Sequence, residues 1–334
     1  MKASLENPIY TVYIVNGTTK YNVTPALDKI DISDPEKQIA QFVTLSLANV
    51  KVGSKLLSNI LQLRDRVYVY ANDGSKNDEV FRGYLWTRGA GEALEDEIFK
   101  LKAYDNLIYF QESEEYEYFS SGKSTKSVMQ SLADKWGVKL SYSYESITHE
   151  KLVLRGALSD IITADILDIV KDKKGKKYVA RSEKDVLQVK TVGSNTTIYT
   201  IKAGKNLTSV SSEETMDGMV TKVVILGKAD DNDRSSIEAT VKGNTSKYGT
   251  LQKIINRDDS TSLADSKKEA NSIIKEKGKP KWTYEIIAPD IPWIRKGDKI
   301  KVEAGTINKY LIAVGIERDI SNKKKTMTIE AEDV

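Results

Sequence analysis

The sequence predicts a protein of the α+β class that is mainly β, built from two similar antiparallel β-barrel domains and smaller α+β modules. Residues 10–105 alternate between apolar and polar types with the period of two that half-buried strands show. Three short segments of this region reappear in the same order near the C-terminus. The longer helical patterns are confined to the middle of the chain and to one later segment, 262–277.

The first barrel domain is expected over residues 1–106. Asn16-Gly17 is the dipeptide best suited to a tight hairpin turn, and it separates the first two strands. Apolar residues at helical spacing predict one short helix over 54–61. The strands of this domain are expected at 10–15, 20–23, 41–48, 66–70, 80–87 and 97–104.

An α+β module is expected over residues 107–197. An acidic, tyrosine-rich connector, 112–118, leads into a helix over 124–136 that ends at Gly137. A second helix is predicted over 161–170, because its isoleucines share one face. Two strands are expected after it, at 177–181 and 186–192.

The second barrel domain is expected to combine residues 198–230 with residues 281–334. The stretch between them, 231–280, is polar and contains the helix 262–277, so it is interpreted as an α+β insertion. The strands of this part of the chain are expected at 197–201, 219–226, 282–287, 299–303, 310–317 and 326–331.

An internal repeat predicts that the two barrels are built alike. Their strands resemble each other in order and approximate spacing, and chance similarity between amphipathic strands is the alternative. The matching pairs are 64–69 with 297–302, 80–85 with 309–314, and 100–105 with 328–333.

The composition excludes several chemistries. The 334 residues include no Cys and one His, which excludes a disulfide framework, thiolate zinc sites and a cysteine nucleophile. The 51 Lys and Arg against 48 Asp and Glu give a net charge of +3, which does not indicate a strongly basic nucleic-acid domain. No signal peptide and no membrane span are expected, because apolar runs are too short.

Few motifs suggest a catalytic or ligand site, and each has a simpler interpretation. Residues 122–125, Gly-Lys-Ser-Thr, resemble the end of a phosphate-binding loop, but the first glycine is missing and carboxylates surround them, so helix initiation is preferred. His149 is interpreted as an exposed loop residue. The acidic pairs 114–115 and 213–214 lie in polar stretches that do not raise a carboxyl pKa, so solvated faces are preferred to glycosidase chemistry.

The remaining motifs also have structural interpretations. Residues 230–233 resemble the start of a calcium loop but lack its later ligands, so a polar turn is preferred. The basic runs 171–177 and 323–325 are interpreted as solvated loops. Trp86 is open either to an interface role or to burial within its own domain. We therefore predict no catalytic, cofactor-binding or metal-binding residue, and no cofactor.

The order of the segments resembles a known family. A β domain ending in Ala103-Tyr104-Asp105-Asn106-Leu107, an α+β module, the stretch 246–255 and the segment Lys296-Gly297-Asp298-Lys299-Ile300 lead into a closing hairpin over 310–331. This order resembles the XkdQ/YqbQ-like baseplate hub proteins of Gram-positive phage tails and tail-derived bacteriocins, relatives of the late control protein D and contractile-tail hub families. The resemblance spans nearly the whole chain. It departs at 317–319, where relatives often have a His.

The resemblance implies a structural, non-enzymatic hub with two tail-tube-like barrels. Such a hub is a homotrimer that adapts a six-fold tail tube to a three-fold central spike. Its implied partners are other copies of the chain, the tube protein, the spike protein and other baseplate proteins, with the tape measure protein as a further alternative. The implied location is the bacterial cytoplasm during assembly and then the virion, prophage-derived tail or bacteriocin particle. The alternatives are a cell-wall hydrolase of the tail tip and a carbohydrate- or surface-binding β module.

Overall fold

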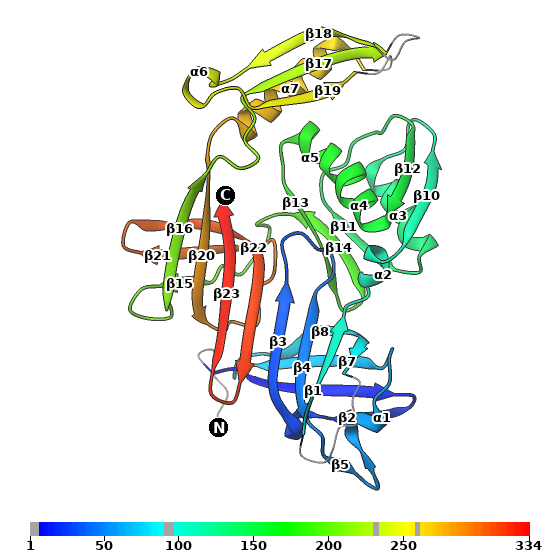
Figure 1. Cartoon of the computed structure of the whole chain (residues 1–334), viewed down its shortest axis with the longest axis vertical. Helices are drawn as coiled ribbons and strands as arrows, with labels where there is room; N and C mark the ends of the chain where they lie inside the picture. Colours follow the sequence, from blue (N-terminus) through cyan, green and yellow to red (C-terminus); the bar gives the residue numbers. More distant parts are fainter. Residues whose placement is uncertain (1–6, 90–96, 230–233, 258–260) are drawn as a thin grey trace.

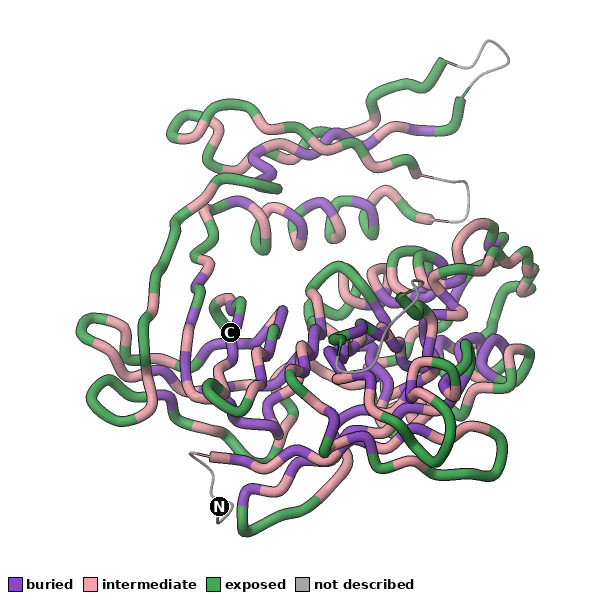
Figure 2. The backbone as a smooth tube through the Cα atoms, turned by 60° about the horizontal axis from the view of Figure 1, so that its bottom comes forward, coloured by how far each residue is buried: buried purple, intermediate pink, exposed green. Residues whose placement is uncertain are grey.

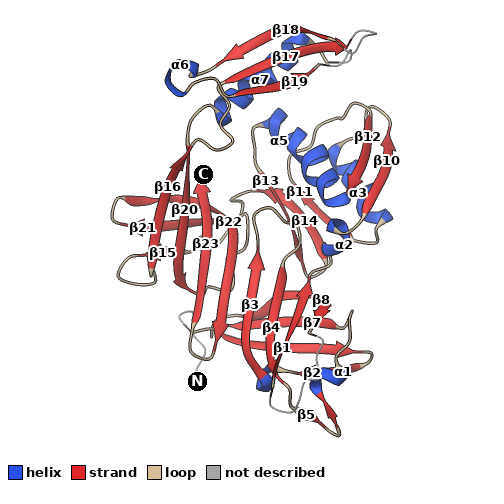
Figure 3. Ribbon diagram, viewed as in Figure 1, coloured by secondary structure: helices blue, strands red, loops and turns tan. Residues whose placement is uncertain are grey.

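The computed structural model describes residues 7–89, 97–229, 234–257 and 261–334. Strands predominate, and the longer helices lie in two separate parts of the molecule (Figure 3). The sheet-rich parts fill the left and the lower right of Figure 1, a part with several helices lies at the upper right, and a smaller part stands at the top. No helix in the described ranges combines the length and the apolar character needed to cross a membrane. The predicted α+β, mainly β class is confirmed.

The first barrel is a run of antiparallel strands in the order β3-β4-β9-β8-β7-β1-β2. Strands β1 and β7 cross beneath β3 and β4 (Figure 1), and both groups contribute to one hydrophobic core. Two short strands, β5 and β6, and the helix α1 form an appendage. The bounds are β1 (Ile9–Asn16), β2 (Thr19–Asn22), β3 (Leu27–Asp34), β4 (Phe42–Ala48), β5 (Lys51–Val52), β6 (Lys55–Leu56), α1 (Leu57–Ile60), β7 (Arg66–Asn72), β8 (Asn77–Arg88) and β9 (Ile98–Tyr104).

Two local predictions for this barrel need correction. The helix predicted over 54–61 is only the four-residue α1, because the backbone returns to an extended conformation at Leu61. Strand β3 was not predicted, although Ile30 and Ile32 alternate there with charged residues and are buried. The alternation was present but short and rich in aspartate, a residue that strands usually disfavour.

The second barrel has the strand order β16-β20-β23-β22-β21-β15. Its core is formed by alternate residues of these strands, with Ile286, Ile300, Leu311 and Ile329 fully or almost fully buried. The bounds are β15 (Thr200–Lys202), β16 (Ser209–Thr215), β20 (Lys281–Pro289), β21 (Lys299–Ala304), β22 (Ile307–Ser321) and β23 (Lys325–Asp333).

The two barrels repeat one another in detail. Strands β3, β4, β9, β8, β7 and β1 occupy the positions of β16, β20, β23, β22, β21 and β15. A bulge follows Leu85 in β8, and an equivalent bulge follows Ala313 in β22. Arg64 (φ 70°) and Gly297 (φ 86°), one residue before the matched aspartates, share the left-handed backbone region. The repeat differs in its outer pair, since β1 runs antiparallel to β7 whereas β15 runs parallel to β21.

The register corrects one of the three sequence matches. Tyr84 lies opposite Arg66 as Ile312 lies opposite Lys299, so Leu85 corresponds to Ala313. The sequence comparison had matched Leu85 with Val314. The slip arises because the bulge in β7–β8 adds a residue that a sequence comparison does not see.

The barrels are joined into one continuous sheet by the pairing of β22 with β3. Ile316 lies opposite Asp34 and Ser321 opposite Lys29. Strand β22 is fifteen residues long, so its first part pairs with β21 and its last part with β3. Because backbone hydrogen bonds cross this boundary, the two barrels form a single framework.

The α+β module packs beside the first barrel around its own core. The tyrosine-rich segment predicted as a connector is strand β10, which pairs with β12, because its residues alternate in exposure. The predicted helices are present as α3 and as a continuous run from α4 through a π-helical turn, Ile161–Leu167, to α5. The bounds are α2 (Ile108–Gln111), β10 (Glu114–Phe119), α3 (Thr125–Lys135), β11 (Lys139–Ser143), β12 (Leu152–Ala157), α4 (Leu158–Asp160), α5 (Asp168–Lys174), β13 (Tyr178–Glu183) and β14 (Val186–Thr191).

The insertion is separate from the barrels and has a hydrophobic core of its own, seen as buried segments in Figure 2. Strand β17 was expected in the second barrel, but it pairs with β18 and β19. The reason is that Val223 and Ile225 pack with Ala270 and Ile273 of α7. The bounds are β17 (Lys222–Ala229), β18 (Ser235–Lys242), α6 (Thr245–Tyr248), β19 (Gln252–Asn256) and α7 (Leu263–Lys277).

Candidate functional site

The most elaborate polar structure of the molecule is the junction where both barrels and the module meet. At its centre lies Asp34, the last residue of β3, which is completely buried. Its carboxylate lies 3.3 Å from Lys296 Nζ and 3.4 Å from Arg295 Nε. Burial opposes ionisation, but Lys296, Arg295 and Arg181 outweigh it and hold the pKa of Asp34 well below its usual range. The end of the first barrel is thus tied to the second by charge.

Arg181 of β13 connects the module to the same junction. Its guanidinium donates to Asp298 Oδ1 at 3.0 Å, to Glu183 Oε1 at 2.8 Å and to the backbone carbonyl of Lys296. The side chain is 5% exposed, so these bonds replace nearly all of its hydration. We call Asp34, Arg181, Arg295, Lys296 and Asp298 the junction network. A buried network of this kind fixes one relative placement of the parts it connects.

The turn between β13 and β14 contacts the first barrel. Lys184 and Asp185 both have positive φ angles, 53° and 66°, as a tight hairpin turn requires. Asp185 Oδ2 lies 2.6 Å from Arg66 NH2 and 3.3 Å from Arg82 NH1, and Lys184 Nζ lies 2.8 Å from Asp78. The module is therefore anchored to both barrels at once.

A second buried cluster also connects the barrels across the β22–β3 boundary. Asp290 accepts a hydrogen bond at 2.9 Å from Arg318 Nε of β22 and another from the hydroxyl of Tyr10 in β1. Burial raises the pKa of Asp290 against the opposing charge of Arg318. Nearby, Trp293 Nε1 donates to Asp73 Oδ2 at 2.7 Å across the same interface.

Asp105, at the end of β9, lies beneath the junction network. Its two oxygens accept hydrogen bonds from the backbone N–H of Gln41 (2.9 Å) and of Leu107 (2.8 Å). Complete burial raises its pKa to about 7, and the neighbouring charge of Asp34 acts in the same direction. The group has no solvent-facing substrate position, so a structural role fits it better than acid–base catalysis.

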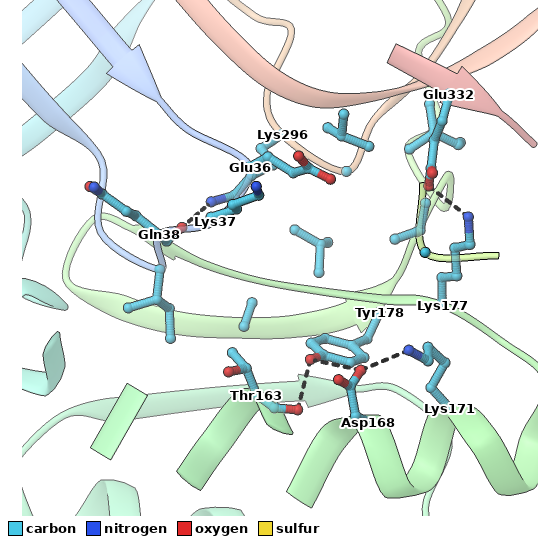
Figure 4. Close-up of a pocket in the computed structure, with 18 of the residues that line it drawn as sticks. Glu36, Lys37, Gln38, Thr163, Asp168, Lys171, Lys177, Tyr178, Lys296 and Glu332 are labelled. Carbon is cyan, nitrogen blue, oxygen red and sulfur yellow. Dashed lines mark hydrogen bonds and ion pairs between the residues drawn. The ribbon is translucent and has the colours of Figure 1, made fainter. Parts of the chain in front are cut away.

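A cavity of about 880 Å³ lies between the module, the insertion, the second barrel and the loop that joins β3 to β4 in the first barrel (Figure 4). Its charged lining consists of seven lysines and seven carboxylates, four of which form two ion pairs. Lys171 lies 3.0 Å from Asp168, and Lys177 lies 2.6 Å from Glu332. The hydroxyl of Tyr178 donates to the Thr163 carbonyl at 2.8 Å. Because positive and negative side chains are equal in number, the lining favours no one ligand charge.

Two candidates from the sequence lie close together in the module. Ser124 caps helix α3, accepting a hydrogen bond from Ser127 N–H at 3.2 Å, as helix initiation predicts. His149 was predicted to be exposed, and this is wrong: the residue is 3% exposed, and its Nε2 lies 2.9 Å from Thr125 Oγ1. Burial lowers the pKa of His149, and the positive charge of Lys173 adds to this effect.

The acidic pairs do not come together into a catalytic arrangement. Glu115 receives hydrogen bonds from Lys135 and from Trp136 Nε1, and although burial opposes them, they lower its pKa. A general acid needs the opposite shift. Glu213 and Glu214 are exposed on β16. No group of three or more potential metal ligands occurs in the described ranges, and the possible calcium loop at 230–233 lies outside the described residues.

Trp86 lies at the bulge of β8, where it packs against the core of the module. Its ring makes edge contacts with Tyr104 (6.3 Å between centroids) and Tyr109 (5.6 Å). Trp86 thus serves an interface within the chain. The basic run 171–177 is likewise engaged, with Lys176 and Lys177 each paired to a carboxylate.

Comparison with known proteins agrees with this architecture. A family model described as YQBQ-like matches residues 19–332, so the chain belongs to the YQBQ-like family. A search of curated proteins found no match.

Solved structures with the same fold include phage tail proteins. A tail protein from Neisseria meningitidis MC58 superposes with a TM-score of 0.68 at 14% identity, covering 97% of this chain and 96% of its own. The 43 kDa tail protein of prophage MuSo2 from Shewanella oneidensis gives 0.67 at 11% identity, with 97% and 100% covered. The E. coli c3393 protein gives 0.56 at 8% identity, with 91% and 73% covered. It is a component of the type VI secretion system and is structurally similar to the T4 tail proteins gp27 and gp5.

Proposed function

We propose that this protein is the structural baseplate hub of a phage tail or a related tail-like particle. The observation that carries the proposal is the pair of barrels with equivalent strand order, joined through β22 and β3 into one sheet. Each chain then offers two quasi-equivalent units. Three chains offer six, which would match a six-fold tube on one side and a three-fold spike on the other. The fold shared with tail proteins supports this proposal.

In this proposal the chain works by fixed geometry and not by catalysis. The junction network and the cluster of Tyr10, Asp290 and Arg318 hold the two barrels in one placement, which a ring of defined diameter needs. The module and the insertion would meet neighbouring baseplate proteins. The four hydrophobic cores correspond, in our proposal, to four domains with an insertion that starts near residue 216. The chain would assemble in the bacterial cytoplasm and remain in the particle.

The test is the mass of the full chain in solution, alone and mixed with the tube protein and the spike protein of the same particle. A hub gives a species of about 112 kDa, three times the 37.3 kDa chain, or a larger complex containing three copies. A chain that stays monomeric with both partners present would contradict the hub. Clearing of a peptidoglycan suspension by that monomer would favour the cell-wall hydrolase instead.

A further inference from the structure

The sheet of the insertion has two faces, and only one of them is covered. Its strands run in the order β18-β17-β19, and helix α7 packs on the inner face against Val223 and Ile225. Helix α7 lies between this sheet and the rest of the molecule, so the opposite face points away from the barrels and the module (Figure 2). We call this opposite face the outer face.

The strand ladders place nine side chains on the outer face. Successive side chains of a strand point to opposite faces, and directly paired residues share a face. None of the nine belongs to a hydrophobic core of the described part of the chain. They form three rows across the sheet: Lys242, Lys222 and Gln252; Thr240, Val224 and Ile254; and Ile237, Leu226 and Asn256.

Two of these rows are largely apolar. Ile237 is 66% exposed and Ile254 is 51% exposed, on either side of β17. Val224 lies beside Ile254, and Leu226 lies beside Ile237. Contiguous exposed apolar side chains mark interaction sites, whereas scattered ones need no explanation. A sheet with apolar residues on both faces is normally covered on both, as in proteins with a helix layer on each side.

The remaining row is basic. Lys222 lies directly opposite Lys242 in the antiparallel ladder of β17 and β18. Like charges in this position destabilise a strand pair. Neither ammonium group has an ion-pair partner among the residues that the structure describes, and none of the nine side chains of the outer face is a carboxylate. The row therefore presents two positive charges that the chain itself leaves unbalanced.

We propose that the outer face binds an amphipathic helix of another protein, with the apolar side of that helix on Ile237 and Ile254 and a carboxylate beside Lys222 and Lys242. This helix would cover the outer face as α7 covers the inner one. A carboxylate near both ammonium groups would also offset their mutual repulsion. The partner's identity as a baseplate protein rests on the proposed hub function, whereas the surface itself rests on the ladders of the insertion.

Two other occupants fit the outer face less well. The same face of a second copy would bring further lysines and no carboxylate, so the charges would not be complementary. Anionic membrane surfaces are recognised by clusters of about four to eight Lys or Arg residues. The outer face has two, Lys222 and Lys242. A partner that is both apolar and acidic is therefore favoured.

Photo-crosslinking tests the contact in the full chain. The photoreactive residue p-benzoylphenylalanine replaces Ile237, and the chain is co-expressed with the other proteins of its particle and irradiated. We expect a covalent adduct with one of these proteins, mapped by mass spectrometry to a helical segment that contains carboxylates. Ile254, also exposed, gives a second position for the photoreactive residue should the first variant fail to fold.

Charge reversal shows whether the lysines take part. The double variant K222E/K242E keeps two like charges opposite each other and changes only their sign, so it should lower the adduct yield several-fold. Replacement of the mapped carboxylate of the partner by lysine should then restore the yield. The matched control, K267E/K275E, makes the same change of charge at exposed positions of α7 and should leave the yield unchanged.

An adduct with a second copy or with lipid, or no adduct from either position, overturns the proposal. An adduct yield that K222E/K242E leaves unchanged, or that the reversed partner does not restore, overturns the role of the lysines. The composition of the particle in the same samples separates this proposal from the hub. A chain that enters the particle without forming the adduct overturns the helix contact alone, whereas a chain absent from the particle overturns the hub as well.

Discussion

Among the residues discussed, Asp105 shows most directly how burial changes the acidity of a side chain. Its carboxyl group is buried and accepts hydrogen bonds from two backbone N–H groups, at the position in the chain where the first barrel ends and the module begins. Its raised pKa of about 7 makes the folded protein bind a proton that the unfolded chain releases near pH 4. Between these values the folded state takes up the extra proton, so stability from this group falls as pH rises and levels off above pH 7.

We predict that Asp105→Asn removes this pH dependence. The wild type should lose about 1 kcal/mol per pH unit relative to the variant between pH 5 and 7, with no further change above pH 7. The variant should be less stable at pH 5, because its amide can accept only one of the two backbone hydrogen bonds. The measurement is denaturant unfolding of both proteins from pH 5 to 8. Asp28→Asn, an exposed control in β3, should follow the wild type; a constant difference for Asp105→Asn would show that the carboxyl does not titrate there.

At the scale of elements, the insertion is the most separable part. Its core draws on Val220, Val223, Ile225, Ala270 and Ile273, all from the same segment. The strands that flank it are neighbours, because Thr215 of β16 lies opposite Lys281 of β20. A chain that leaves and re-enters a sheet at adjacent positions needs only a hairpin turn to close it.

We predict that replacing residues 216–280 by Asn-Gly leaves the rest of the protein folded. Circular dichroism should keep the strand signal and lose helix, and the melting temperature should stay within a few degrees of the full chain. As the complementary experiment, residues 216–280 expressed alone should show cooperative unfolding. Aggregation of the shortened chain would mean that residues around the cavity beside the insertion make essential contacts.

At the scale of the whole molecule, the two barrels behave as one body. The β22–β3 ladder, the junction network and the Tyr10–Asp290–Arg318 cluster all cross the boundary between them. Arg318 is 2% exposed and Asp290 is not exposed at all. Loss of one partner from such a pair leaves an uncompensated charge inside the protein.

Arg318→Met should therefore destabilise the entire chain by about 3 to 5 kcal/mol, in a single shifted transition. Lys268→Met, which breaks an exposed ion pair with Asp265, should leave the unfolding midpoint close to that of the wild type. Denaturant unfolding followed by tryptophan fluorescence measures both. Separate transitions in Arg318→Met would indicate that the barrels are coupled by this cluster more than by the sheet, and an unchanged midpoint would contradict the assigned role of the pair.

The separation in sequence between two interacting residues explains which features could be predicted. Strands such as β7, β9 and β21 follow from period-two alternation, which a few neighbouring residues display. Strand β16 shows little alternation, because it is exposed on both faces, and its assignment depends on pairing with β20 about 70 residues away. His149 carries no local sign of burial; only its packing near Thr125 reveals it.

The sequence by itself determined the mainly β class, the repeat of two barrels and the family resemblance, because strand periodicity and segment order are properties of short stretches. The tertiary structure alone decided that the barrels share one sheet. Ile316 meets Asp34, and Arg295 meets the same aspartate, across some 260 to 280 residues. No local pattern records such a pairing, since its stability comes from groups that become neighbours, and lose water, only when the whole chain has folded.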